Sequence, residues 1–178
     1  MAMILIRHTK PRIAPGTCYG RTDLDVAESF EIEANLVVEA LPPVSRVITS
    51  PLKRCRRLAE FIAFESRLPI EIEPRLQEMD FGRWEGVPWD HVPRDELDAW
   101  AADFLHACPH GGESVAQLRQ RTRQALTDWR METQTTLCVT HAGVIRAALS
   151  TGDRASDFGT KIDFGGMIQA PSNIGNAP

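Results

Sequence analysis

Two stretches decide the fold: Ile-Leu-Ile-Arg-His-Thr at residues 4–9 and Leu-Cys-Val-Thr-His-Ala-Gly at residues 137–143. Each is a run of buried-type strand residues that delivers a histidine, His8 or His141, at its carboxyl end. Parallel α/β sheets gather such ends at one crevice, so histidines that are distant in sequence can become neighbours there. Because Arg7 stands beside the first histidine, we expect this crevice to handle an anion, and phosphate fits best.

Strand patterns and helix patterns alternate along the chain. Apolar or alternating runs predict strands at 2–6, 44–49, 70–73, 136–139 and 165–170. Apolar residues at helical spacing predict helices over 30–41, 51–62, 97–105, 115–129 and 144–149. This alternation favours an α/β fold with three layers, α/β/α, around a mostly parallel central sheet.

Local signals mark two helix starts and two loops. Ser50 before Pro51 predicts a helix with serine as the N-cap and proline at the first helical position. Ser114, with Gln117 three residues on, predicts a capping box. The turn-rich stretch 11–25 and the irregular stretch 74–92 are predicted loops, and the first is long enough to suggest a function.

The composition is that of one ordinary globular domain. Of 178 residues, 43% are hydrophobic and 25% charged, and the formal net charge is −4. This charge gives no support to nucleic-acid binding. No apolar run reaches the roughly 18 residues that a membrane span needs. We expect a single domain over residues 1–170 and a flexible C-terminal tail over residues 171–178; the composition does not indicate an oligomeric state.

The N-terminal residues and the cysteines predict a cytoplasmic protein. The first residues lack the basic leader and long apolar stretch of a secretory signal. The four cysteines contain no Cys-x-x-Cys pair, and Cys55 and Cys138 fall in apolar patterns, as expected for small core residues in a reduced compartment.

Four polar side chains are expected at one rim of the sheet. His8 follows the first strand, Arg54 lies in the first helical turn after the second strand, Glu78 follows the third, and His141 follows the strand at 136–139. Polar groups that converge at the carboxyl ends of strands are the usual basis of an α/β active site.

The motifs that carry these residues occur in a specific order: Arg7-His8, then 50–55, 77–86 and 140–143. This set resembles the histidine phosphatase superfamily, with the phosphoglycerate-mutase-like fold, over about residues 3 to 149. Further motifs at 7–11, 18–21 and 112–114 resemble alpha-ribazole phosphatases and their relatives. Thr9 and Lys10 stand where the broader family has glycine and an acidic residue, which makes a mutase less favoured.

The resemblance implies that His8 attacks phosphorus and becomes a phosphohistidine. A neutral imidazole is nucleophilic near pH 7 if a hydrogen bond to its other ring nitrogen fixes the tautomer. The guanidinium groups of Arg7 and Arg54 match phosphate oxygens, and His141 adds a donor at a helix start. Further substrate contacts are expected from Thr9, Tyr19, Gly20 and Arg21, although Tyr19 and Arg21 fit a loop-packing role equally well. We expect no metal and no cofactor.

The resemblance also implies that Glu78 protonates the leaving oxygen and later activates water. Asp80 is the alternative acid, and the family motif favours Glu78.

The sequence therefore predicts a metal-independent phosphomonoesterase that acts on a small phosphate ester such as alpha-ribazole 5′-phosphate. Alternatives are a broad-specificity sugar or small-molecule phosphatase, a phosphoglycerate-type mutase, and a phospho-ligand binding module without turnover. A metal-dependent hydrolase is disfavoured, because the histidines lack ligand spacing.

Other conspicuous side chains have structural interpretations. A solvated helix face is expected for Arg119, Arg121 and Arg123. Ordinary surface or helix positions are expected for His91, His106 and His110. Core or lid packing is expected for Trp84, Trp89 and Trp100.

Overall fold

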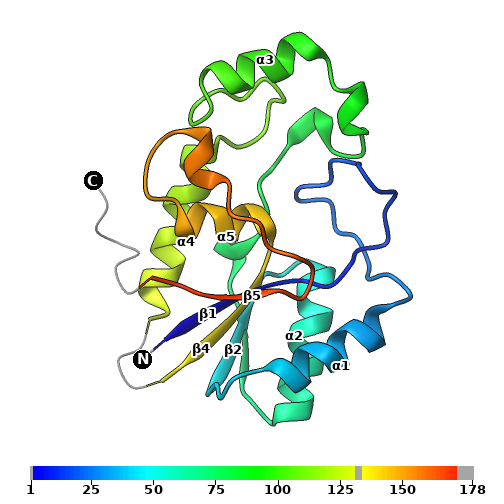
Figure 1. Cartoon of the computed structure of the whole chain (residues 1–178), viewed down its shortest axis with the longest axis vertical. Coiled ribbons are helices and arrows are strands. Elements are labelled where there is room, and N and C mark those ends of the chain that lie inside the picture. The colour runs from blue at the N-terminus through cyan, green and yellow to red at the C-terminus, as the bar shows by residue number, and fades with distance from the viewer. Residues whose placement is uncertain (1, 131–133, 172–178) are drawn as a thin grey trace.

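The computed structural model describes residues 2–130 and 134–171 (Figure 1). One sheet contains five strands in the order β3-β2-β4-β1-β5. Their bounds are β1 Met3–Arg7, β2 Arg46–Thr49, β3 Ile70–Ile72, β4 Thr136–Thr140 and β5 Met167–Gln169. Neighbouring strands from β3 to β1 are parallel, and β5 is antiparallel to β1. The predicted α/β fold with a mostly parallel sheet is confirmed.

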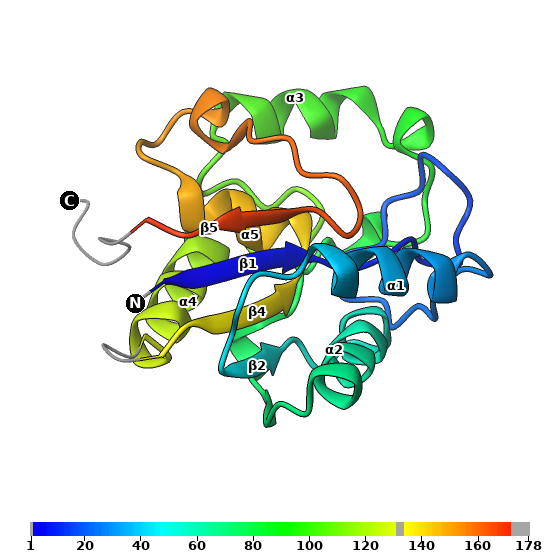
Figure 2. The same cartoon turned by 60° about the horizontal axis from the view of Figure 1, so that its bottom comes forward.

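Helices cover both faces of the sheet. Their bounds are α1 Phe30–Ala40, α2 Lys53–Ser66, α3 Arg94–Ala102, α4 Val115–Asp128 and α5 Ala142–Leu149. One apolar core joins α1 and α2 to the sheet, and a second core on the opposite face joins α4 and α5 to it. Figure 2 shows α3 apart from both layers, on the side of α4 and α5.

The sheet residues alternate between the two cores. Leu137 and Val139 of β4 pack towards α1 and α2, whereas Cys138 between them packs towards α4 and α5. Every residue of β4 is buried. A strand buried on both faces requires the continuous apolar run seen in the sequence, and it fixes the position of His141, which follows it.

The two predicted helix caps have different outcomes. The capping box of Ser114 and Gln117 is present at the start of α4 and is confirmed. The prediction of Ser50 as an N-cap is wrong: α2 begins at Lys53, and extended Leu52 occupies the cap position without a side-chain bond. The Ser50 hydroxyl lies 2.8 Å from Nε2 of His141 instead.

Turns and loops join these elements, and the long segment at 8–29 between β1 and α1 contains the predicted loop at 11–25. The loop at 74–92 contains three 3₁₀ turns, at Pro74–Leu76, Gly82–Trp84 and Trp89–His91. After α5, the chain passes through a further turn at Ala155–Phe158 before it reaches β5. The predicted tail lies outside the described residues from 172 onwards. Among the residues that are described, every helix is too short or too polar to cross a membrane.

The arginines of α4 are not a solvated face, so that prediction is wrong. Each donates to backbone carbonyls: Arg119 to Gly152, Arg123 to Ser150, and Arg121 to the loop at 75–78. The side chain of Arg121 is only 21% exposed. Helical periodicity places these residues on the polar side of α4, and that side faces neighbouring loops that cover it.

One histidine also departs from its predicted surface position. His91 and His106 are exposed as expected, but His110 is 1% exposed. Its Nδ1 accepts a hydrogen bond from the backbone N–H of Gly112 at 3.0 Å. The ring packs against Trp84, with centroids 4.8 Å apart, because the chain turns back at Gly111.

Candidate functional site

The carboxyl ends of β1 and β4 bring the two histidines together. His8 and His141 follow adjacent parallel strands, and the backbone N–H of His8 donates to the carbonyl of Thr140 at 3.0 Å. The ring centroids are 5.2 Å apart, and each residue is at most 1% exposed. Two sequence segments more than a hundred residues apart thus meet as the strand pattern predicted.

Arg54 reaches the histidines from the first turn of α2. It is fully buried, and its two Nη atoms donate to the carbonyls of Gly20 and Thr22, each at 2.7 Å. The guanidinium carbon lies 5.1 Å from the ring centre of Tyr19. Its Nε–H is buried and has no partner within the described residues.

Arg7 approaches from the end of β1. Its Nη1 donates to the carbonyl of Ile162 at 2.8 Å, and its guanidinium stacks 3.8 Å above the ring of Phe164. Its Nε–H also lacks a partner within the described residues. A buried cationic donor without a partner is costly, and an anion that accepts from both arginines removes that cost.

The tautomer of His8 is fixed by its own backbone neighbour. Nδ1 lies 2.6 Å from the carbonyl oxygen of Thr9. A carbonyl oxygen can only accept, so Nδ1 carries the proton and Nε2 keeps its lone pair. Burial and the positive charges of Arg54 and Arg7 hold the pKa of His8 well below its ordinary value. The ring is therefore neutral near pH 7, which is the form a nitrogen nucleophile needs.

His141 precedes the first turn of α5 and is held by the end of β2. Its Nε2 lies 2.8 Å from the hydroxyl of Ser50 and 3.4 Å from the sulfur of Cys55. Burial and the positive charge of Arg54 hold the pKa of His141 well below its ordinary value. We call Arg7, His8, Arg54 and His141 the anion end of the site.

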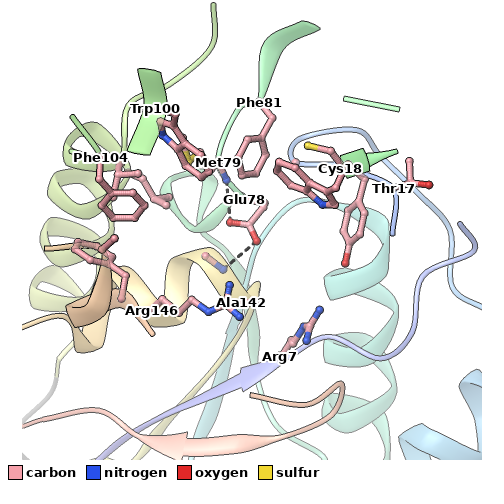
Figure 3. A pocket seen from close by; sticks show the side chains of 18 residues that line it. Arg7, Thr17, Cys18, Glu78, Met79, Phe81, Trp100, Phe104, Ala142 and Arg146 are labelled. Carbon is pink, nitrogen blue, oxygen red and sulfur yellow. Dashed lines mark hydrogen bonds between the residues drawn. The ribbon is translucent and has the colours of Figure 1, made fainter. Parts of the chain in front are cut away.

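Glu78 lies across the site from β1 and is bonded to backbone donors (Figure 3). One carboxylate oxygen accepts from the N–H of Met79 at 2.9 Å, and the other accepts from the N–H of Gly143 at 3.0 Å. A Cβ at residue 143 would collide with the Glu78 carboxylate. The glycine therefore permits the close approach that places this carboxylate at the start of α5.

Arg121 of α4 fixes the loop that carries Glu78. Its Nη atoms donate to the carbonyls of Gln77 at 2.8 Å and Glu78 at 3.1 Å. Its Nε donates to Glu113 at 2.6 Å, and the N–H of Glu113 in turn donates to the carbonyl of Asp80 at 2.8 Å. The loop is thus held on both sides of Met79, by Arg121 of α4 and by Glu113 just before that helix.

A cavity of about 350 Å³ opens beside these groups. Arg7, Glu78 and Gly143 line one part of it, together with Tyr19 and Gly20. Figure 3 shows the side chains of Arg7 and Glu78 directed into the same space from opposite sides. Of the anion end, Arg7 lines this cavity, whereas His8, Arg54 and His141 are buried and are not among its lining residues.

The other predicted site residues lie at varied distances from this space. Thr9 is buried, its carbonyl oxygen contacts the ring of His8, and its hydroxyl has no partner among the described residues. The side chain of Arg21 lies outside the cavity lining, 3.3 Å from Gln77 and 3.5 Å from Asp80. Asp80 is likewise absent from the lining, and its other oxygen accepts from the N–H of Gly82 at 2.8 Å.

Several residues of the site were missed by sequence reasoning. Ser50 was interpreted as a helix cap, and Arg121 as a surface residue. Phe164, which stacks on Arg7, and Arg146, which lines the cavity, carried no recognisable pattern. The position of residue 146, one turn after Ala142 on α5, is the signal that could have placed it at the same rim.

The histidine phosphatase superfamily (branch 1) model matches residues 3–157. The chain belongs to this superfamily. Relatives of this chain in the superfamily carry the names of phosphatases and of mutases.

Relatives carry both kinds of name. A probable phosphoglycerate mutase GpmB of Photorhabdus laumondii is 33% identical over 137 residues, which are 73% of this chain and 63% of that protein. The adenosylcobalamin/alpha-ribazole phosphatase of Salmonella typhimurium is 29% identical over 177 residues, covering 93% of this chain and 87% of the relative. The chain thus spans less than two thirds of the first relative and most of the second.

Solved structures show the same fold. A phosphoglycerate mutase from Thermus thermophilus superposes with a TM-score of 0.76 at 28% identity, covering 95% of this chain and 92% of that one. A mycobacterial glucosyl-3-phosphoglycerate phosphatase superposes with a TM-score of 0.81 at 21% identity, covering 94% and 88%, and this likeness concerns the fold alone.

Proposed function

We propose that this histidine phosphatase is a metal-independent phosphomonoesterase whose reaction passes through a phosphohistidine at His8. One observation carries the proposal: His8 is neutral with its proton on Nδ1, the positive charges of Arg54 and Arg7 act on its ring, and each arginine has a buried Nε–H without a partner among the described residues. A phosphate dianion would satisfy these donors and meet the nucleophile in the same position.

In the first step, Nε2 of His8 forms a bond to phosphorus while the bond from phosphorus to the ester oxygen breaks. The guanidinium groups of Arg7 and Arg54 stabilise the charge on the phosphoryl oxygens during transfer. The leaving alkoxide takes a proton from the carboxyl group of Glu78, which becomes a carboxylate.

In the second step, water replaces the alcohol. The Glu78 carboxylate takes a proton from water, the water oxygen bonds to phosphorus, and the bond to Nε2 of His8 breaks. Inorganic phosphate leaves, and both side chains return to their starting protonation states. Backbone donors at Met79 and Gly143 keep the carboxyl group in place for both roles.

For the substrate we propose alpha-ribazole 5′-phosphate. The support is the Salmonella relative, which aligns over nearly the whole chain, and the motifs at 7–11 and 18–21. A phosphoglycerate-type mutase is the second candidate, because the Photorhabdus relative has the higher identity. It competes less well because the alignment leaves over a third of that relative unmatched.

The test is turnover of p-nitrophenyl phosphate with EDTA present. We expect EDTA to leave the rate unchanged and His8→Ala to lower kcat by about 10⁴-fold or more. His106→Ala removes an exposed histidine and is the matched control, with an unchanged rate. Loss of all activity in EDTA, or a fully active His8→Ala, would overturn the mechanism.

A panel of esters ranked by kcat/KM tests the substrate. Alpha-ribazole 5′-phosphate is expected above phosphoserine and 3-phosphoglycerate. Conversion of 3-phosphoglycerate to 2-phosphoglycerate without release of phosphate would favour the mutase.

A further inference from the structure

One aromatic residue, Phe164, packs against the anion end. It lies in the segment between the turn at Ala155–Phe158 and β5. Among the described residues its ring contacts are with Arg7, whose guanidinium carbon is 3.8 Å from the ring centre, and with His8, at a centroid distance of 5.6 Å. Phe164 belongs to none of the apolar clusters that the described residues form. Its ring is therefore placed by the site and not by a hydrophobic core.

The backbone beside Phe164 is bonded to the same two residues. The N–H of Gly165 donates to the carbonyls of Arg7 and His8, at 3.0 and 3.2 Å, and the N–H of Arg7 donates to the carbonyl of Gly166 at 3.1 Å. Gly165 has a φ of +71°, a conformation that residues with a side chain rarely adopt. These bonds fix Phe164 beside the end of β1, so its ring lies against the site before any ligand binds.

The two arginines of the anion end are held in different ways. Both Nη atoms of Arg54 donate to backbone carbonyls. In the part of the chain that is described, Arg7 donates from Nη1 alone, to the carbonyl of Ile162, and Phe164 covers the face of its guanidinium. An aromatic face attracts a guanidinium and uses none of its N–H donors. Arg7 is thus held in place while Nη2 and Nε stay free to donate to an anion.

The same ring covers one side of His8. The imidazole is flanked by Phe164 and by His141, at centroid distances of 5.6 and 5.2 Å, and His8 is 1% exposed. Phe164 is itself partly exposed, and its ring is one of the groups that shield His8 from water. Burial is the main reason why the pKa of His8 lies below its ordinary value. A ring that excludes water therefore keeps the nucleophile in its neutral form.

We propose that Phe164 is a positioning residue for phosphoryl transfer: it holds the guanidinium of Arg7 ready for phosphate and keeps water from the ring of His8. The inference rests on the proposed function, because it concerns the groups that bind and attack phosphorus. Phe164 is not among the lining residues of the cavity, so it acts through these two residues and does not touch the substrate. The irregular segment before β5 thereby has a part in the reaction.

Phe164→Leu tests the contact with Arg7, because leucine keeps apolar bulk and removes the aromatic face. We expect the dissociation constant of inorganic phosphate, measured by titration calorimetry, to rise about tenfold. Phe164→Tyr keeps the face and should bring the constant back to within about twofold of the original. The matched control is Phe64→Leu, on the exposed surface of α2, with unchanged affinity. Equal affinities in Phe164→Leu and the original protein would overturn the proposal.

Two further measurements separate positioning from a general effect on packing. Because Phe164 lies outside the apolar cores, Phe164→Leu should lower Tm by less than about 3 °C while kcat/KM for p-nitrophenyl phosphate falls about tenfold. In Arg7→Met, which has no guanidinium to hold, Phe164→Leu should change phosphate affinity by less than about twofold. A tenfold loss in both backgrounds would show that Phe164 does not act through Arg7, and would contradict the proposal.

The contact with His8 is tested by Phe164→Ala, which lets water reach the imidazole. The pKa of His8 should then rise towards its ordinary value, because the charged form is better hydrated. Attack needs the neutral ring, so the acid limb of the p-nitrophenolate burst should move to higher pH by about one unit. Arg7, Arg54 and His141, which also face His8, are unchanged in this variant. If Phe164→Ala does not fold, Phe164→Val replaces it, with a shift in the same direction. An unmoved acid limb would contradict the proposal.

Failure of this inference differs from failure of the proposed function. Ester hydrolysis that depends on His8 and is unaffected by Phe164→Leu would overturn the inference and leave the proposed function standing. If the original protein hydrolyses no ester, the proposed function fails, and a role of Phe164 in its reaction fails with it.

Discussion

The two ends of the cavity are built by different parts of the chain. The anion end lies at the carboxyl ends of β1 and β4 and in the first turn of α2: Arg7 ends β1 and lines the cavity, and the other three members are at most 1% exposed. The other end is an aromatic chamber, whose rings come from α3, the segments around it and the turn after α5 (Phe81, Trp89, Trp100, Phe104 and Phe158). Strand ends fix the position of reacting groups tightly, whereas loops and short helices can change the leaving-group side without moving them.

Glu78 lies at the junction of the two ends, and its replacement gives the largest expected effect of the variants compared here. Glu78→Gln keeps an acceptor near Met79 and removes the proton that the leaving oxygen needs. We expect kcat to fall about 10³-fold for an alkyl phosphate. For p-nitrophenyl phosphate the first step, measured as the burst of p-nitrophenolate, should slow at most about tenfold, because p-nitrophenolate leaves without a proton.

The matched control for that prediction is Asp80→Asn, which removes the alternative acid. Its rates are expected to stay within about twofold of the original. If Asp80→Asn instead shows the loss that depends on the leaving group, Asp80 and not Glu78 is the acid.

Gly143→Ala moves the Glu78 carboxylate without changing its chemistry. Because the added methyl group would overlap that carboxylate, we expect the alkyl phosphate rate to fall about 10²-fold. The burst of p-nitrophenolate from p-nitrophenyl phosphate, which reports the first step alone, should again slow much less. Equal losses for both esters would show that Gly143 acts on phosphate binding at the anion end, and measurement of the inhibition constant for inorganic phosphate would show the same.

Arg121→Met tests whether the loop at the junction needs its anchor in α4. The variant loses the bonds to the carbonyls of Gln77 and Glu78, and we expect about a tenfold lower kcat for alkyl phosphates with little change in phosphate affinity. The control is Arg123→Met on the same helix, which loses a hydrogen bond to the carbonyl of Ser150. If both variants lose activity in proportion to lost thermal stability, Arg121 is only a structural residue.

The smallest expected effect is a pH dependence of stability at the anion end. The pKa of His8 is lowered in the folded protein, chiefly by burial. As pH falls below about 6.5, the unfolded chain binds a proton that the folded chain does not, so the free energy of unfolding falls. The contribution is complete above about pH 6.5 and decreases by up to about 1.4 kcal/mol per pH unit until the lowered pKa is reached.

Urea unfolding at pH 7.5, 6.5 and 5.5 measures this dependence. His8→Asn should lose about 1 kcal/mol less than the original protein between pH 6.5 and 5.5. His106→Asn, at an exposed position, should match the original protein. Identical slopes for all three would show that His8 is protonated as readily in the folded state as in the unfolded one.

The same contrast explains what the sequence could predict. His8 and His141 follow strands whose apolar runs are readable locally, and the parallel topology then places both at one edge. Ser50 was misread because a serine before a proline gives the same local pattern at a helix cap and at a strand end. Only the position of His141, set by the register of β2 and β4, distinguishes the two.

Other parts depend on contacts that have no local pattern. Arg121 falls on the polar side of α4, and only the tertiary fold brings carbonyls of the loop at 75–78 against it. Phe158 and Phe164 come from the segment between α5 and β5, which has no helical or strand period. The aromatic chamber could therefore not be assembled from sequence, although its tryptophans were recognised as packing residues.

The central claim is that His8 becomes covalently phosphorylated during turnover. The most direct measurement is acid-free quenching of the enzyme with ³²P-labelled substrate, followed by peptide mapping at alkaline pH. We predict a label that is stable in base and labile in acid, on the peptide that contains His8, and absent from His8→Ala. A label on another residue, or turnover without any label on His8, would contradict the account.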